Sequence, residues 1–271
     1  LSFFWNGHNN FFEEVAKFRA SRRMWHKIMT ERFGAKKESS KLLRFHTQTG
    51  GSTLTAQQPL NNVVRVAVQS LAAVIGGTQS LHTNGFDEAL NLPTEKAART
   101  ALRTQQIIGF ESGIANTVDP LGGSYFVEEL TNAIEAEALK LMDQISEMGG
   151  AVSAVENGWI QDQIANSSYL YQKEVESKES IVVGVNQFQV EEVASPPSFK
   201  INDSIRDTQT QKINQLKAKR DNNKVSESLE KLKVACSSNN NLMPYILDAV
   251  EQYATLGEIA DILRGEFGEF A

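Results

Sequence analysis

Short apolar runs alternate with helical stripes along the first half of the chain. Three runs are typical of strands: 1–5, 42–47 and 78–83. Between them, segments 11–32 and 57–75 carry apolar residues at helical spacing, and a third helix is expected from Glu88 onward. Strand, loop and helix therefore recur at intervals of about 40 residues, which predicts an α/β fold with parallel strands.

Three parallel strands do not make a closed structure. A barrel with a packed interior has about eight strands, and a three-stranded sheet leaves its edges unpaired. We therefore expect residues 1–130 to form the C-terminal part of a (β/α)8 TIM barrel whose earlier strands are not in this chain. In such a fold, polar groups at the carboxyl ends of the strands face the ligand.

Residues 131–271 are expected to be mainly helical. Helical spacing is present in four stretches: 130–148, 151–164, 211–235 and 242–267. The pair Gly149-Gly150 separates the first two, and a short β-type run covers 181–185. Pro196-Pro197 marks an extended linker over 191–204. The sequence thus predicts a barrel part over 1–130 and a helical extension over 131–271.

Composition narrows the class of protein. The chain has 271 residues, of which 41% are hydrophobic, enough for a folded core. The net charge of −6, without a polybasic tract, argues against nucleic acid as a partner. No apolar run reaches the roughly 18 residues that cross a bilayer, so no membrane partner is expected. The single cysteine, Cys236, argues against an internal disulfide and fits a reducing, cytoplasmic location.

His46 and Gln48 form the first candidate site. Residues two apart on a strand share a face, so both side chains could point into one cavity. An imidazole and a carboxamide can each donate and accept a hydrogen bond, which suits a carbonyl or amide ligand. The equally weighted alternative is a buried histidine that is satisfied by the backbone.

More neutral polar groups surround the second and third strands. Gly50-Gly51 permits close approach to a ligand, although such a pair is also an ordinary turn. Gln79 and Asn84 flank the third strand, and Asp87-Glu88 follow, where acids in a first helical turn would favour the helix dipole. No metal-ligand spacing and no nucleophilic triad can be assembled. Such a set suits a large polar cofactor that carries the chemistry itself.

Several ordered motifs carry a family resemblance. The clearest are Arg44-Phe45-His46-Thr47-Gln48-Thr49-Gly50, Thr78-Gln79-Ser80-Leu81-His82-Thr83-Asn84 and Asp119-Pro120-Leu121-Gly122-Gly123-Ser124-Tyr125. Segments 1–5, 10–17, 52–57, 61–65 and 181–186 add to them in order along nearly the whole chain. Together they resemble the large (catalytic) subunit of methylmalonyl-CoA mutase. The match departs at Ser52, where some members carry a tryptophan against the corrin.

The resemblance implies an isomerase that uses adenosylcobalamin (coenzyme B12) to rearrange the carbon skeleton of an acyl-CoA by radical chemistry. It implies that residues 1–130 are about strands 6–8 of a barrel that threads the CoA chain along its axis and carries the corrin at one end. The family's first barrel strands and its cobalamin-binding domain, with a DxHxxG motif, are not in this sequence. We therefore expect the isolated chain to be inactive.

The resemblance also implies residue roles. Ser2 and Phe4 would line the CoA channel, and His46 and Gln48 would lie along the path of substrate and pantetheine. Gly51 and Glu88 would face the cobalamin, with Glu88 accepting a hydrogen bond from the ribose of the adenosyl group. Gln79 and Asn84 would line the cavity shared by the substrate and that group. On this basis Gln79 and His46 are the candidate catalytic residues, and no residue is a metal ligand.

The implied partners are an acyl-CoA, a complementary barrel half, and a cobalamin-binding subunit or domain, in a hetero- or homo-oligomer. One alternative is a non-catalytic structural subunit of a heteromeric mutase, and another is a plain CoA-binding module. The polar set Gln79, Asn84 and Glu88 favours the catalytic chain over both. An isobutyryl-, ethylmalonyl- or 2-hydroxyisobutyryl-CoA mutase would carry the same motifs.

Overall fold

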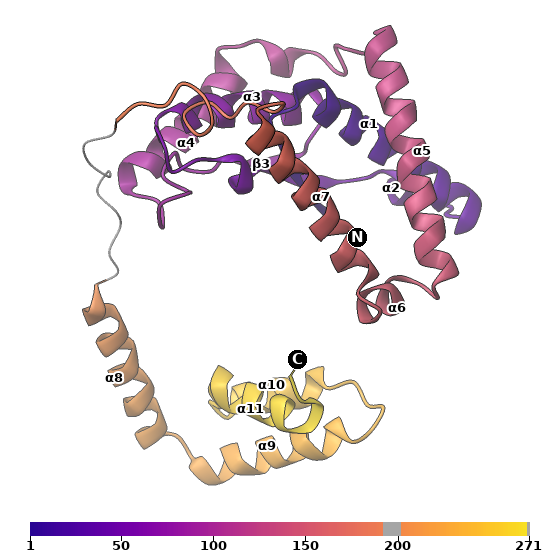
Figure 1. Ribbon diagram of the computed structural model, residues 1–271. Coiled ribbons are helices and arrows are strands. Elements are labelled where there is room, and N and C mark those ends of the chain that lie inside the picture. Colours follow the sequence, from indigo (N-terminus) through magenta and orange to yellow (C-terminus); the bar gives the residue numbers. More distant parts are fainter. Residues whose placement is uncertain (192–201, 270–271) are drawn as a thin grey trace. The chain divides into compact units, whose positions relative to one another are not determined.

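The computed structural model describes residues 1–191 and 202–269 (Figure 1). The chain divides into two compact units, Leu1–Phe199 and Lys200–Ala271. Most of the linker expected over 191–204 falls outside the described residues, while Asp203 already belongs to a helix. The boundary expected after residue 130 marks the end of a barrel part, and this stays a prediction. Helix α5 (Tyr125–Glu147) runs across that position.

A three-stranded parallel sheet organises the first unit. Strands β1 (Phe3–Gly7), β2 (Phe45–Thr49) and β3 (Ser80–His82) lie in the order β1-β2-β3. The register pairs Phe4 with His46 and Gln48 with His82. The predicted α/β class and the parallel strands are confirmed. Within the described part of the chain, β1 and β3 pair only with β2, so each has an open edge.

One face of the sheet packs on helices. Helix α1 (Phe11–Lys27) continues into the π-turn η1 (Ile28–Arg32), and α3 (Asn61–Ile75) forms the next crossover. Phe18 of α1 stacks on Phe45 of β2, with ring centroids 5.2 Å apart. Leu43 and Ala73 are buried in the same core, and the partly buried side chains that pack against it are Phe3, Trp5, Trp25 and Leu81. Aromatic side chains are thus buried on one face of the sheet, and the other face carries mainly polar residues.

The third helix starts later than the sequence pattern predicted. Helix α4 spans Glu95–Phe110, and the Thr94 hydroxyl caps it by accepting from the Ala97 amide. Asp87 and Glu88 therefore do not lie in a first helical turn. Asp87 is buried and accepts hydrogen bonds from the Thr94 amide and hydroxyl instead. The expectation failed because Asp87 serves the loop before the helix, seven residues ahead of the cap.

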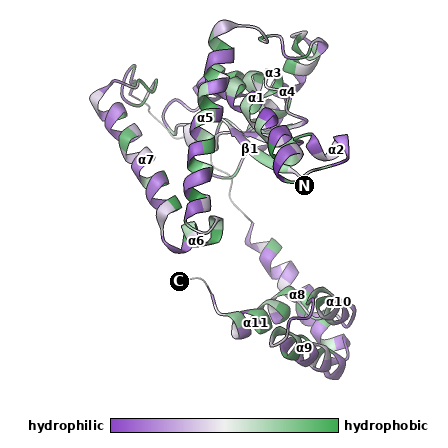
Figure 2. Cartoon of the chain, turned by 90° about the vertical axis from the view of Figure 1, so that its right-hand side faces the viewer, coloured by the Kyte–Doolittle hydropathy of each residue, from purple (hydrophilic) through white to green (hydrophobic). Residues whose placement is uncertain are grey.

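A helical hairpin follows, built from α5, α6 (Ala151–Glu156) and α7 (Trp159–Ser177). Helix α5 lies along α1, while α7 has no buried residue and is largely hydrophilic in Figure 2. The pair Gly149-Gly150 ends α5 with positive φ angles of 94° and 102°, as its composition predicted. The β-type run expected at 181–185 forms only an isolated bridge, Val183 with Gln187.

Short elements complete the first unit: α2 (Glu38–Lys41) and the 3-10 turns η2 (Gly51–Thr53) and η3 (Ile114–Asn116). The second unit contains four helices among its described residues: α8 (Asp203–Lys219), α9 (Asn222–Cys236), α10 (Met243–Glu251) and α11 (Leu256–Phe267). Leu232, Ala249 and Ile259 form its core. No helix in the described ranges is both long and apolar enough to cross a membrane.

Candidate functional site

The uncovered face of the sheet carries a small array of polar side chains. Because side chains alternate along a strand, His46 and Gln48 share this face, as predicted. Asn6 and His82 lie on either side of Gln48 by register. We call this set, together with Phe4 and Ser80, the polar sheet face. Its members are exposed or half-buried, in contrast to the buried Phe45, Thr47 and Thr49 between them.

His46 is held by side chains and not by the backbone. Its Nδ1 lies 2.7 Å from the Ser80 hydroxyl, and its ring centroid is 5.2 Å from that of Phe4. Phe4 is 61% exposed, which leaves an aromatic surface beside the imidazole. Ser2 precedes β1 and is also exposed. The alternative of a buried histidine satisfied by the backbone is therefore wrong for His46.

Gly51, Asn84 and Glu88 meet at the carboxyl end of the sheet. A Cβ added to Gly51 would lie 3.1 Å from Asn84 Nδ2 and 3.5 Å from Glu88 Oε1. Asn84 is buried and donates to the Thr49 carbonyl at 2.9 Å, while its Oδ1 accepts from Gln48 Nε2 at 3.0 Å. Glu88 is exposed. We call these three residues the carboxyl rim.

His8 extends the carboxyl rim, and sequence reasoning did not place it in the site. A Cβ at Gly50 would lie 2.8 Å from His8 Cδ2, so the imidazole rests directly on this glycine. Residues 4, 6 and 8 follow the same two-residue repeat as residues 46, 48 and 50, with which they lie in register. This repeat is the sequence signal that could have identified His8 as a residue of the site. Three of the chain's four histidines thus belong to one side of the sheet or its rim.

Two buried carboxamides on α3 hold the loops at this end. Asn62 Oδ1 accepts from the Thr55 amide at 3.1 Å, and its Nδ2 donates to the carbonyls of Thr55 and Phe86. Gln69 Nε2 donates to Asn9 Oδ1 and Thr53 Oγ1. Both carboxamide side chains are fully buried. Each links two loops that follow different strands, which preorganises the carboxyl rim.

Gln79 lies at the opposite, amino end of the sheet. Its Oε1 accepts from the Phe45 amide at 2.7 Å and its Nε2 donates to the Gly77 carbonyl at 2.8 Å. The Gln79 side chain thus provides the hydrogen-bond partner of the first amide of β2. Gln79 and Asn84 thus flank β3 at different ends, and the expectation that both line one cavity stays a prediction.

The chemistry available at the carboxyl rim is hydrogen bonding without metal ligation. Among the described residues, no group of three or more His, Cys, Asp or Glu side chains could hold a metal ion. The rim instead offers an amide, an imidazole, one exposed carboxylate and a glycine surface that lacks side-chain bulk. A flat, amide-rich ligand with free hydroxyl groups would find donors, acceptors and space for close approach there.

Comparison with known protein families fits this geometry. The family model described as Methylmalonyl-CoA mutase matches residues 1–269. The chain is 45% identical over 272 residues to the 2-hydroxyisobutanoyl-CoA mutase large subunit of Aquincola tertiaricarbonis, covering 100% of this chain and 48% of that protein. It is 45% identical over 271 residues to the mitochondrial methylmalonyl-CoA mutase of Homo sapiens, covering 99% of this chain and 36% of the human protein.

A probable mitochondrial methylmalonyl-CoA mutase of Caenorhabditis elegans is 42% identical over 272 residues, with 100% of this chain and 37% of that protein covered. The chain therefore spans less than half the length of these relatives. The match nevertheless extends from the first strand to the last helix of the structure. By this match and by its parallel α/β core, the chain belongs to the methylmalonyl-CoA mutase family.

Proposed function

We propose that this chain supplies part of the substrate and cofactor site of an acyl-CoA mutase that uses adenosylcobalamin and rearranges the carbon skeleton of a CoA thioester, as in the conversion of methylmalonyl-CoA to succinyl-CoA. The observation that carries the proposal is the meeting of Gly51, Asn84 and Glu88 at one end of a polar sheet face. The sheet would be the part of a TIM barrel that comprises about strands 6–8.

The polar sheet face supports a path for the acyl-CoA. His46, fixed by Ser80, presents an imidazole that can hydrogen-bond a thioester or amide carbonyl. Gln48, tied to Asn84, offers a second group on the same face. Phe4 and Ser2 would border the path where it passes the amino end of β1. We propose His46 as the catalytic residue on the substrate side, and the hydrogen bonds of Gln79 support a structural role for that residue.

The carboxyl rim supports the cofactor. When bound, adenosylcobalamin supplies the organic radical with which the rearrangement begins. Gly51 would let the macrocycle approach the backbone closely, and Asn84, oriented by Thr49, would donate or accept a hydrogen bond. The exposed Glu88 carboxylate would accept hydrogen bonds from the ribose hydroxyls. A separate cobalamin-binding subunit or domain would hold the rest of the cofactor.

The open sheet edges support the partners. β1 and β3 each leave one edge without a neighbour among the described strands, and unpaired strand edges favour pairing with further strands. A complementary barrel half would fill this place, in a hetero- or homo-oligomer. The unpaired Cys236 supports a reducing location such as the cytoplasm.

A second candidate concerns the substrate. Identity to the 2-hydroxyisobutanoyl-CoA mutase large subunit equals that to the human methylmalonyl-CoA mutase, so a branched hydroxyacyl-CoA is as well supported as a dicarboxylic one. Both substrates would use the same carboxyl rim and polar sheet face.

The test is reconstitution. The chain is produced together with the barrel strands and the cobalamin-binding part of a relative, and turnover is measured with methylmalonyl-, ethylmalonyl-, isobutyryl- and 2-hydroxyisobutyryl-CoA. We expect turnover of at least one ester that depends on adenosylcobalamin and is lost in His46→Ala. A complex that assembles and binds CoA esters and cofactor but rearranges none of them would identify a non-catalytic subunit and contradict the proposal.

A further inference from the structure

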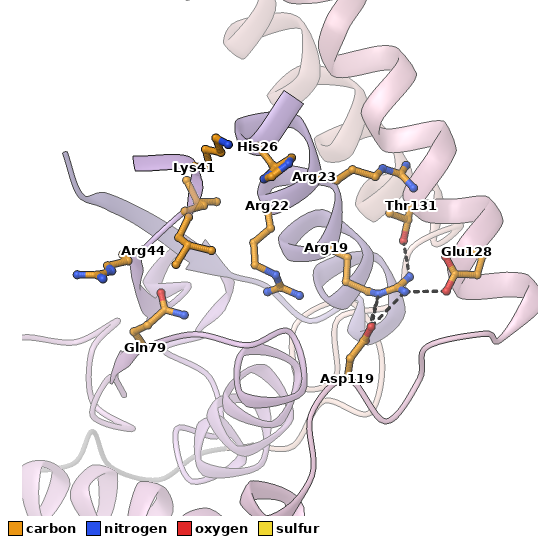
Figure 3. A pocket seen from close by; sticks show the side chains of 12 residues that line it. Arg19, Arg22, Arg23, His26, Lys41, Arg44, Gln79, Asp119, Glu128 and Thr131 are labelled. Carbon is orange, nitrogen blue, oxygen red and sulfur yellow. Dashed lines mark hydrogen bonds and ion pairs between the residues drawn. The ribbon is translucent and has the colours of Figure 1, made fainter. Parts of the chain in front are cut away.

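A basic cavity lies at the amino end of the sheet, opposite the carboxyl rim (Figure 3). Its volume is about 620 Å³, and it is bounded by α1, the segment 41–44 that precedes β2, Gln79 and the first turns of α5. It therefore lies where the helices meet the amino ends of the strands. None of the residues assigned to the carboxyl rim lines it.

Positive charge exceeds negative charge in the lining of this cavity. Five cationic side chains line it: Arg19, Arg22, Arg23, Lys41 and Arg44. The two acidic lining residues, Asp119 and Glu128, are both engaged by Arg19, at 3.1 and 2.6 Å. Two further cations have partners outside the lining, since Arg23 pairs with Glu135 and Lys41 with Glu38.

Among the described residues, Arg44 and Arg22 are the two lining cations without a carboxylate partner, and Arg22 is the less exposed of the two. No Asp or Glu of the described residues lies within 4.0 Å of its guanidinium, and its hydrogen bond goes to the Gly76 carbonyl through Nη1. Gly77 makes room for it, because a Cβ there would lie 2.7 Å from Arg22 Nη1. Figure 3 shows the Arg22 side chain reaching into the cavity between Gln79 and Arg19. Its other N–H groups make no hydrogen bond within the described part of the chain and can therefore donate to a ligand.

The position of Arg22 is electrostatically costly without an anion. Burial lowers the pKa of Arg22, and the positive charge of Arg19 lowers it further, while Asp119 acts in the opposite sense. A guanidinium that is partly withdrawn from water needs a counter-charge or good hydrogen bonds. Asp119 is paired with Arg19, so a bound anion would supply the direct counter-charge that Arg22 lacks.

We propose that this cavity binds the phosphate group of a phosphate monoester. A guanidinium presents planar donors that match two phosphate oxygens, and Arg44 and Lys41 add positive charge at the margin of the cavity. The cavity is much larger than a phosphate ion, and Leu42 and Leu43 give it an apolar wall for the organic part of the ligand. The site is independent of the mutase function proposed above.

The experiment titrates the full chain with inorganic phosphate and with phenyl phosphate at constant ionic strength, following the arginine Nε–Hε signals by NMR. We expect saturable shifts of the Arg22 signal, with tighter binding of phenyl phosphate. Arg22→Gln should weaken binding by at least about tenfold. Arg44→Gln, on an exposed side chain, should weaken it about two- to fivefold.

Arg99→Gln is the matched control, because Arg99 pairs only with Glu95 on the exposed side of α4 and should leave binding unchanged. Absence of a saturable shift at Arg22, or equal binding by folded Arg22→Gln and the original chain, would overturn the proposal. If Arg22→Gln does not fold, the direct Arg22 signal and the Arg44→Gln comparison still decide it. Equal or weaker binding of phenyl phosphate would contradict the assignment to a monoester.

Discussion

The imidazole of His8 occupies the space that a side chain at Gly50 would need. A Cβ there would come within 2.8 Å of His8 Cδ2 and 3.1 Å of its Nε2. The backbone of Gly50 is extended, with φ of −70°, a conformation that any L-residue can adopt. A side chain at this position would therefore clash with the His8 ring without straining the backbone. The contact links the first two strands at the end where the cofactor is proposed to bind, and the Gly50 amide reinforces it by donating to the Gly7 carbonyl at 2.7 Å.

We predict that Gly50→Ala destabilises the first unit through overpacking, by about 1–3 kcal/mol. In His8→Ala the ring contact is gone and the Gly7 carbonyl oxygen, 3.2 Å from the added methyl group, remains the close neighbour, so Gly50→Ala should cost less in that background. Urea unfolding followed by tryptophan fluorescence measures this, since all three tryptophans lie in the first unit. Gly109→Ala is the control: its Cβ meets nothing within 4 Å on α4, and it should stabilise by about 0.5–1 kcal/mol. Equal costs in both backgrounds would show that the His8 ring does not rest on Gly50.

The Asn62 side chain should contribute more to the free energy of unfolding than its position on the crossover helix α3 indicates. Asn62→Ala removes the partner of the Thr55 amide and of the Phe86 carbonyl, and buried groups left unpaired cost about 1–3 kcal/mol each. We expect a loss of at least about 2 kcal/mol in unfolding free energy, with faster hydrogen exchange in the loops after β2 and β3. The neighbouring Asn61→Ala, which loses one contact to Gln58, is the control. A loss no larger than that of Asn61→Ala would contradict the role given to Asn62.

Acid should weaken the contact between α1 and α5. The hydrogen bond from Arg19, and then that from the Gly123 amide, lowers the pKa of Glu128 from 4.5 to about 2. The folded state therefore holds the Glu128 proton less tightly than the unfolded state does. The stabilisation is complete above pH 4.5 and is lost as the pH falls towards 2.

In Arg19→Gln this part of the pH dependence should diminish, because the main cause of the lowered pKa is gone. Unfolding free energies measured from pH 6 down to pH 2 would show a shallower decline than in the original chain. Glu95→Gln, at an exposed pair on α4, should leave the decline as it was. An unchanged slope in Arg19→Gln would mean that the ion pair does not form in solution.

Periodicity along the chain predicted the parts of this structure that depend on local pattern. The two-residue repeat correctly placed His46 and Gln48 on one face, and the pair Gly149-Gly150 correctly marked the end of a helix. Contacts between segments were not visible in the sequence. Gln79 reaches across to the Phe45 amide, and Asp87 reaches forward to Thr94, so residues that read as site groups support the backbone. His8 was passed over because its contact with Gly50 joins positions 42 residues apart.

The central claim is that the carboxyl rim binds the adenosyl group of the cofactor, and Glu88 tests it most directly. The measurement is the dissociation constant of adenosylcobalamin for the reconstituted complex, determined by calorimetry for the original chain, Glu88→Gln, Glu88→Ala and His46→Ala. A charged acceptor bonded to hydroxyls contributes about 1.5–3 kcal/mol, or about 10- to 100-fold in affinity. We predict that loss for Glu88→Ala, a smaller one for Glu88→Gln, and unchanged cofactor affinity for His46→Ala. Cofactor affinity in Glu88→Ala equal to that of the original chain would contradict the account.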